Sequence, residues 1–312
     1  MSIRAMAEEI SNQTQDLPRF ASHLRQKHEP NIERSSLMFA GSGDSYAAAV
    51  FAQELSRGEA IALDPYELLT NIRRTKGKTL VIISVGGKTR TNLELAKRAK
   101  DVARRTLAVT ANPDSPLAKV CDETLQLNYR ASGVLTSGTV SFTTSLLACA
   151  FLVGRLPRIL QVRTGLATAS LLSTSMGPIP RGSFIFTGSE VNFALSLYGA
   201  AKVNEVLAVK AEAVYPEQIG HAKLFTIDNK RDRIVCISSG RDKAMQTGEL
   251  LRRGGFQISI LRVPTGHIFN RSLRVAIFLQ RLAFSLAERK GIKECAFLSD
   301  KSTLNLSNRI IY

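Results

Sequence analysis

The sequence lacks several features that would place it in other classes of protein. It has no tryptophan and only four cysteines, and no two of these have the CxxC spacing of a zinc site. Its longest apolar stretch, residues 145–154, stops at Arg155, short of the roughly 18 residues that a membrane-spanning helix needs. The N-terminal MSIRAMAEEI has no secretory signal pattern. We therefore expect a cytoplasmic protein with buried free thiols and without a metal site or a membrane segment.

The charge is strongly one-sided. The 312 residues carry a net charge of +16, which by itself would permit nucleic-acid binding. The basic residues, however, are scattered through expected helices such as 96–105 and 250–253, and no aromatic residues are interleaved with them. We therefore do not expect a nucleic acid as the partner, and we interpret the charge as a cationic surface that attracts anionic metabolites.

The first half of the chain alternates between short apolar runs and helical patterns. The apolar runs predict buried strands at 36–40, 78–84, 106–110 and 123–127. Between and around them we expect helices at 5–28 (interrupted near Pro18), 45–57, 91–105, 116–121 and 137–156. Strands that alternate with helices predict a parallel sheet with helices on both faces.

The second half repeats this pattern. Prolines and glycines in 155–182 indicate a domain junction. We then expect strands at 183–187, 233–239 and 257–263, and helices at 191–209, 242–253 and 271–289. The predicted organisation is a first domain at 1–165, a second at 166–298 and a polar tail at 299–312.

Three loops of the first half are rich in glycine and hydroxyl groups. They are Gly41-Ser42-Gly43-Asp44-Ser45, Ser84-Val85-Gly86-Gly87-Lys88-Thr89 and Leu135-Thr136-Ser137-Gly138-Thr139. Loops at the carboxyl ends of parallel strands bind ligands, and glycines with free amides at a helix start suit phosphate. Neither GxGxxG nor a Walker A sequence is present, which argues against a nucleotide site.

Three stretches of the sequence carry a family resemblance. MFAGSGDSYAAA (38–49) and VIISVGGKTRTNLELAKRAK (81–100) resemble the phosphate loops of SIS (sugar isomerase) domains. The stretch 186–228, which includes AAKVNEVLAVKAEAVYPEQIGHAK, resembles the second SIS domain of the isomerase half of glucosamine-6-phosphate synthase. The resemblance covers nearly the whole chain. It implies an α/β fold of two tandem SIS domains, each a flavodoxin-like parallel sheet.

The resemblance also implies roles for individual residues. Glu205 matches the carboxylate base and His221 the histidine that opens the sugar ring. A homodimer is implied, in which the neighbouring subunit donates this histidine to a shared active site. The substrate-binding positions are Gly43, Asp44, Ser45, Ser84, Val85 (through its amide), Gly86, Gly87, Thr89, Ser137, Lys202, Glu217 and Asn308.

The sequence departs from the family pattern at several of these places. Gly86 stands where the second serine of the phosphate loop is expected, and Gly138 stands at the sugar-contacting serine, next to Ser137. Asn308 stands where the family tail has an imine-forming lysine, and Lys301 would substitute only if the tail were shifted.

These observations favour an enzyme. We expect an aldose–ketose isomerase that acts on a hexose 6-phosphate or an amino-hexose 6-phosphate, of the fructose 6-phosphate or glucosamine 6-phosphate type, through a cis-enediol. This chemistry needs no metal and no cofactor. Two alternatives stay open: a glucosamine-6-phosphate deaminase, and a regulator that binds a sugar phosphate without turnover.

Overall fold

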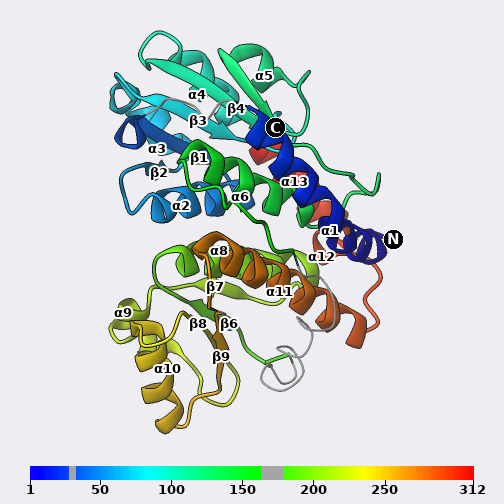
Figure 1. Cartoon of the computed structure of the whole chain (residues 1–312). Helices are drawn as coiled ribbons and strands as arrows, with labels where there is room; N and C mark the ends of the chain where they lie inside the picture. The colour runs from blue at the N-terminus through cyan, green and yellow to red at the C-terminus, as the bar shows by residue number, and fades with distance from the viewer. Residues whose placement is uncertain (28–32, 163–178, 264) are drawn as a thin grey trace. The chain divides into compact units, whose positions relative to one another are not determined.

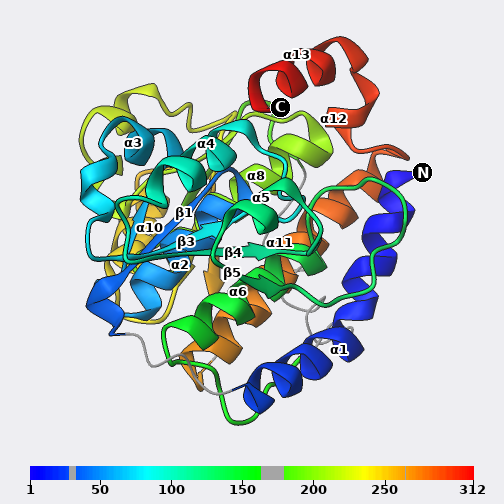
Figure 2. The ribbon, with the colours of Figure 1, turned by 90° about the horizontal axis from the view of Figure 1, so that it is seen from above.

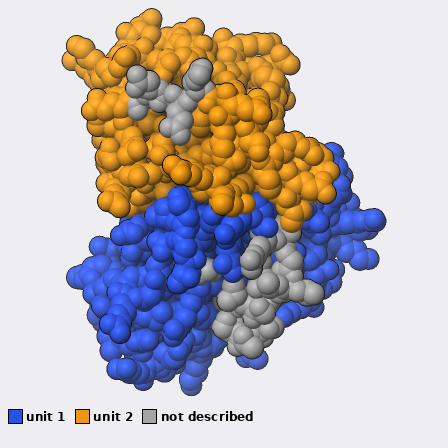
Figure 3. All heavy atoms as spheres, viewed as in Figure 1, with its two compact units in different colours: residues 1–11, 132–139, 161–300 blue, residues 12–131, 140–160, 301–312 orange. Residues whose placement is uncertain are grey.

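A computed structural model describes residues 1–27, 33–162, 179–263 and 265–312. The chain forms two compact units (Figure 3). Unit 1 is residues 1–11, 132–139 and 161–300, and unit 2 is residues 12–131, 140–160 and 301–312. The predicted boundary between residues 165 and 166 lies outside the described residues, so the division at 1–165, 166–298 and 299–312 stays a prediction.

Unit 2 contains a five-stranded parallel sheet. Its strands lie in the order β2 (Ile61–Leu63), β1 (Leu37–Gly41), β3 (Thr79–Ile83), β4 (Arg105–Thr110), β5 (Glu123–Gln126). This is the 2-1-3-4-5 order of flavodoxin-like sheets. The direction of strand order reverses between β1 and β3.

Helices cover both faces of this sheet, as Figures 1 and 2 show. On one face lie α3 (Pro65–Thr70), α4 (Arg90–Ala99) and α5 (Pro116–Val120), and on the other α2 (Asp44–Leu55) and α6 (Val140–Leu152). Alternate strand residues, among them Met38, Leu80 and Ile82, pack under α3, α4 and α5. Because both faces are covered, the central strands are buried at every position, which explains their continuous apolar sequence.

Unit 1 contains a four-stranded parallel sheet in the order β7 (Ala211–Ala213), β6 (Phe184–Thr187), β8 (Arg233–Ser238), β9 (Ile258–Arg262). On one face α8 (Val191–Leu207) packs along α11 (Ile268–Arg289). On the other, α9 (Pro216–Ile219) and α10 (Lys243–Arg253) pack on Ile185, Ile234 and their neighbours.

The remaining described elements are short or terminal. Helix α1 (Ser2–Gln26) contributes to both units, and α13 (Lys301–Ile311) belongs to unit 2. The other short helices are η1 (Arg34–Ser36), η2 (Ile72–Thr75), η3 (Ala222–Thr226) and α12 (Ala296–Ser299).

The structure corrects several predicted boundaries. The first helix begins at Ser2, earlier than residue 5, and continues through Pro18. The helix expected at 91–105 ends at Ala99, because Arg105 already belongs to β4. The helix expected at 137–156 is α6, which begins only at Val140. The polar tail predicted at 299–312 contains the helix α13, for which the sequence analysis gave no secondary structure.

One glycine of unit 2 generates a stability prediction. Gly87 has a φ of +62°, and a Cβ there would lie 2.2 Å from Oγ of Ser115, whereas Gly86 has open space around its Cβ position. We expect Gly87→Ala to lower the free energy of unfolding by about 2–4 kcal/mol, from the left-handed backbone and the clash together. The matched control Gly86→Ala should change it by less than about 0.5 kcal/mol. Urea unfolding compares the two, and equal midpoints would contradict the prediction.

Candidate functional site

The first predicted phosphate loop connects β1 to α2 in unit 2. A Cβ on Gly41 would lie 2.7 Å from the backbone of Ser45, so the chain approaches itself too closely for a side chain there. Gly43 is the N-cap of α2 with a φ of 59°, and no side chain caps this helix. Asp44 is the first helical residue and is half-buried. An uncapped helix N-terminus of this kind favours an anion.

The second predicted loop, residues 84–89, is held firmly by the segment after β4. The carbonyl oxygen of Val85 accepts hydrogen bonds from Oγ1 of Thr110 and from the amide of Ala111, both at 3.0 Å. The carbonyl of Gly87 accepts one from the amide of Leu117 at 3.1 Å. The carbonyl groups of Val85 and Gly87 therefore accept hydrogen bonds from the protein itself, and these bonds fix the loop.

The same loop leaves its donors available. Within the described chain, the hydroxyls of Ser84 and Thr89 and the amides of Val85, Gly86 and Lys88 have no hydrogen-bond acceptor. Thr89 is the N-cap of α4 but makes no side-chain capping bond. Five donors on one rigid loop are suited to an oxyanion such as phosphate.

The two loops emerge at the same edge of the sheet. β1 and β3 are parallel neighbours, and Gly41 at the end of one pairs with Ile83 at the end of the other. This is the point at which the strand order reverses, where doubly wound sheets bind their ligands.

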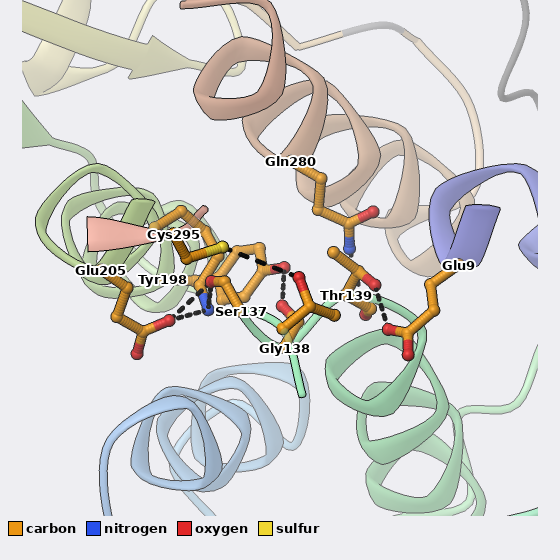
Figure 4. A network of polar contacts seen from close by, with 10 residues as sticks. Glu9, Ser137, Gly138, Thr139, Tyr198, Glu205, Gln280 and Cys295 are labelled. Atoms are coloured by element: carbon orange, nitrogen blue, oxygen red, sulfur yellow. Dashed lines mark hydrogen bonds and ion pairs between the residues drawn. The ribbon is translucent and has the colours of Figure 1, made fainter. Parts of the chain in front are cut away.

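Three predicted residues come together in unit 1. Oε2 of Glu205 accepts hydrogen bonds from Oγ of Ser137 and from Nζ of Lys202, both at 2.6 Å. Nζ of Lys202 also donates to Oγ of Ser137 at 2.7 Å. The spacing of Lys202 and Glu205 along α8 places both on one face of the helix. Figure 4 shows Ser137 approaching Glu205 from the 132–139 loop.

The electrostatics of this cluster keep Glu205 ionised. Lys202 is fully buried, whereas the Glu205 side chain is 37% exposed. Burial by itself would raise the pKa of Glu205, but the Lys202 ammonium and the hydrogen bonds from Lys202 and Ser137 outweigh it. The net pKa therefore lies below the ordinary value of 4.5. Oε1 of Glu205 has no partner among the described residues, so one carboxylate oxygen is anchored and the other is available.

The loop that carries Ser137 is braced by residues that the sequence analysis missed. Glu9, from α1, accepts from Oγ1 of Thr139 at 2.8 Å, and Nε2 of Gln280 donates to the carbonyl of Thr139 at 3.1 Å. The hydroxyl of Tyr198 donates to the carbonyl of Gly138 at 2.8 Å, and its ring lies 5.2 Å from Nζ of Lys202. The sequence around Glu9 gives no signal that this buried helix residue bonds to a loop more than a hundred residues away.

His221 and Glu217 lie apart from this cluster in the described contacts. The His221 side chain is 70% exposed, and its Nε2 is 3.9 Å from Oε1 of Glu217. Glu217 pairs instead with Lys243, 2.8 Å away, and that hydrogen bond and charge lower its pKa. The described structure therefore gives His221 no contact with Glu205.

Asn308 and Lys301 are both exposed on α13 in unit 2. The carbonyl of Asn308 accepts the amide of Tyr312, and the carbonyl of Tyr312 accepts a hydrogen bond from Nε of Arg90 at 3.1 Å. Arg90 is the first residue of α4 and follows the 84–89 loop directly. The C-terminal residue is thus attached next to that loop.

Two kinds of site are missing from the part of the chain that the structure describes. There is no group of three or more His, Cys, Asp or Glu side chains that could hold a metal ion. Among the same residues, no helix combines the length and apolarity needed to cross a bilayer. All four cysteines are buried free thiols.

The fold and the loops together define an α/β protein with parallel sheets, in which two loops with unused hydrogen-bond donors or an uncapped helix start lie at a strand-order reversal. Residues 32–155 match the family model described as the SIS domain. The chain is similar to two curated glutamine–fructose-6-phosphate aminotransferases (isomerizing). Identity is 21% over 92% of this chain for the protein of Pyrococcus horikoshii and 24% over 82% for that of Sulfolobus acidocaldarius. The chain spans about half the length of these relatives, 53% and 48%.

Solved structures show the same fold. The C-terminal domain of glucosamine-fructose-6-phosphate aminotransferase from Francisella tularensis has a TM-score of 0.72 at 19% identity, over 93% of this chain and 97% of that one. Glucosamine-6-phosphate deaminase from Thermotoga maritima also gives 0.72 at 19%, over 92% and 95%. Tagatose-6-phosphate ketose/aldose isomerase from Escherichia coli gives 0.65 at 16%, over 94% and 92%. Residues 32–155 therefore match a SIS domain, and the chain as a whole is similar in sequence to the two aminotransferases and in fold to these solved structures.

The buried ion pair generates an asymmetric stability prediction. Glu205→Ala strands a fully buried ammonium, so we expect a loss of about 3 kcal/mol in the free energy of unfolding. Lys202→Met leaves a partly exposed carboxylate that water and protonation can relieve, so its loss should be smaller. The double variant should be more stable than the sum of the single losses predicts. A urea-unfolding double-mutant cycle measures this, and additive losses would contradict it.

The pH dependence of the same variants has a definite sign. The pKa of Glu205 is lowered in the folded state, so its contribution to stability is present at neutral pH and disappears as the pH falls through that folded pKa. The stability gap between the wild type and Glu205→Ala should therefore narrow in acid.

Proposed function

We propose that this chain is a phosphosugar aldose–ketose isomerase that acts on a hexose 6-phosphate or an amino-hexose 6-phosphate. The observation that carries the proposal is the Ser137–Lys202–Glu205 cluster, a carboxylate kept ionised with one oxygen anchored and the other available. The SIS domain match and the names of the similar proteins support the substrate class.

Glu205 would move the proton between the two reacting carbons. Oε1 removes the proton from C2 of the open-chain aldose, which gives a cis-enediolate that becomes the cis-enediol when its C1 oxygen takes up a proton. The carboxyl group then returns the proton to C1 while the C2 hydroxyl loses its own proton, and the ketose forms. The Lys202 ion pair keeps the carboxylate deprotonated at neutral pH, and Ser137 fixes its orientation.

The loops of unit 2 would bind the phosphate group of the substrate. Ser84, Thr89 and the amides of the 84–89 loop offer donors that the described protein leaves unused, and the uncapped start of α2 adds a favourable dipole. The substitution of Gly86 for serine removes a hydroxyl but keeps an amide.

His221 would open the sugar ring, in a homodimer in which the neighbouring subunit supplies it. Its 70% exposure leaves it accessible to a second chain. Phe225, four residues later, is 88% exposed and would be accessible to a second chain as well.

A deaminase is the alternative enzyme, and the fold it shares with the Thermotoga maritima deaminase keeps it open. A regulator that binds without turnover is the other alternative, favoured by the replacement of the tail lysine with Asn308. Ammonia release identifies the deaminase, and stabilisation by ligand without turnover identifies the regulator.

The activity prediction concerns Glu205→Gln. With fructose 6-phosphate, glucose 6-phosphate or glucosamine 6-phosphate as substrate, we expect the wild type to interconvert at least one aldose–ketose pair. Glu205→Gln should lower kcat by at least about 100-fold, because an amide cannot accept the proton. Glu94→Gln is the matched control, since Glu94 is a helix glutamate of similar exposure, 42%, paired with Arg98. Full activity of Glu205→Gln would refute the assignment.

The binding prediction concerns the hydroxyls of the second loop. Ser84→Ala and Thr89→Val should each weaken sugar-phosphate binding by about 10-fold or more, because each removes a hydrogen bond to a charged group. Thr70→Val, at an exposed position whose hydroxyl bonds its own helix, should leave affinity unchanged. Isothermal titration calorimetry measures the three variants. Equal affinity in all three would place the phosphate elsewhere.

A further inference from the structure

The two sheets repeat one arrangement of strands and loops. β7-β6-β8-β9 in unit 1 corresponds in order and direction to β2-β1-β3-β4 in unit 2. The loops that follow β6 and β8 are therefore the counterparts of the two phosphate loops that follow β1 and β3. Each pair leads into a long helix, α8 and α10 in unit 1 and α2 and α4 in unit 2.

The first loop has the same backbone in both units. A Cβ on Gly188 would lie 2.7 Å from the backbone of Asn192, just as a Cβ on Gly41 would meet Ser45, four residues on in each case. The helix N-caps match as well. Gly43 has φ 59° and ψ −127°, and Glu190 has φ 54° and ψ −136°. Glu190 keeps a left-handed backbone that favours glycine, so the geometry persists despite its side chain.

The second loop differs between the units in one respect that concerns anions. In unit 2 the N-cap Thr89 makes no capping bond. In unit 1 the N-cap of α10 is Asp242, whose Oδ1 accepts from Oγ of Ser238 at 2.7 Å and from the amide of Met245 at 2.9 Å. Its Oδ2 accepts from the amide of Ser239 at 2.7 Å. The amide of Gly240 is bonded too, to Oγ of Ser238 at 3.1 Å.

Thus two donors of the unit 1 loop, the Ser238 hydroxyl and the Ser239 amide, bond to a carboxylate, whereas the corresponding donors of the unit 2 loop remain unused. We propose that Asp242 is an internal anion that occupies, in unit 1, the position a phosphate takes in unit 2, and so limits the chain to one phosphate site. This rests on the proposed role of the 84–89 loop. A phosphate at the 238–242 loop would find these donors already bonded, and the negative charge of Asp242 would repel it.

Nearby cations do not reverse this balance. Lys243, the first residue of α10, pairs with Glu217 at 2.8 Å. Arg241 is exposed in the same loop, and the described contacts include no ion pair between it and Asp242. The carboxylate of Asp242 therefore stays the anion that the loop's own donors contact.

The test counts phosphate ions bound per chain, with inorganic phosphate as the probe in equilibrium dialysis. We expect one ion for the wild type. Asp242→Gly removes the carboxylate but keeps an acceptable N-cap residue, and should bind two. Asp242→Asn is the matched control, since it fills the same volume and keeps one acceptor oxygen for the Ser238 hydroxyl and the Met245 amide, and it should bind one. Two ions on the wild type, or one on a folded Asp242→Gly, would overturn the proposal.

A second measurement covers the case in which Asp242→Gly does not fold. In the otherwise native chain, Ser84→Ala/Thr89→Val should abolish saturable phosphate binding, because the unit 1 loop cannot replace it. The proposal would also be overturned if this double variant still bound phosphate saturably, if Asp242→Asn did not change that binding and if Ser238→Ala weakened it. Such binding would come from the unit 1 loop. No phosphate on the wild type but one on Asp242→Gly would contradict the proposed function and leave the role of Asp242 standing.

Discussion

The ammonium of Lys202 is fully buried, and a buried charge is tolerated only beside a counter-charge and hydrogen-bond acceptors. Glu205 supplies the charge from the next turn of α8, and Ser137 supplies the hydroxyl. Because Ser137 comes from the loop 132–139, this single requirement determines where that loop lies within unit 1. Glu9 and Gln280 then hold the far end of the loop. The ion pair with Lys202 thus both orients the candidate catalytic carboxylate of Glu205 and keeps it ionised.

In unit 2, the 84–89 loop keeps a fixed position although several of its hydrogen-bond donors are unsatisfied. The carbonyl groups of the 84–89 loop are bonded to the segment after β4, so the loop is rigid although several of its amides are free. In the corresponding loop of unit 1, the Ser238 hydroxyl and the Ser239 amide donate to Asp242. The same loop arrangement therefore occurs twice in the chain, once with unused donors in unit 2 and once with donors bonded to a carboxylate in unit 1. The side chain of Asp242 makes this difference.

Much of the fold could be predicted because buried parallel strands leave long apolar runs. The strands β1, β3, β4, β6 and β8 appear where those runs predicted them, within a residue or two. The three-residue strands β2 and β7 are too short to give a periodic pattern. The start of α6 was placed too early, because the sequence does not show that the polar groups of residues 137–139 bond to Glu205, Tyr198 and Glu9 instead of continuing a helix.

The alternation of apolar runs and helical patterns along the sequence by itself predicted an α/β chain. The positions of the glycines predicted loops at the carboxyl edge of a parallel sheet. The family resemblance, and not composition, singled out Lys202 and Glu205, whereas Ser137 lies in one of the loops rich in glycine and hydroxyl groups. Only the tertiary structure decided that the three side chains meet, that Glu9, Tyr198 and Gln280 hold them, and that His221 has no described contact with Glu205. The physical reason is that hydrogen bonds between residues far apart in sequence depend on how whole helices pack. Buried strands and glycine turns, by contrast, depend on residues that are neighbours in the sequence.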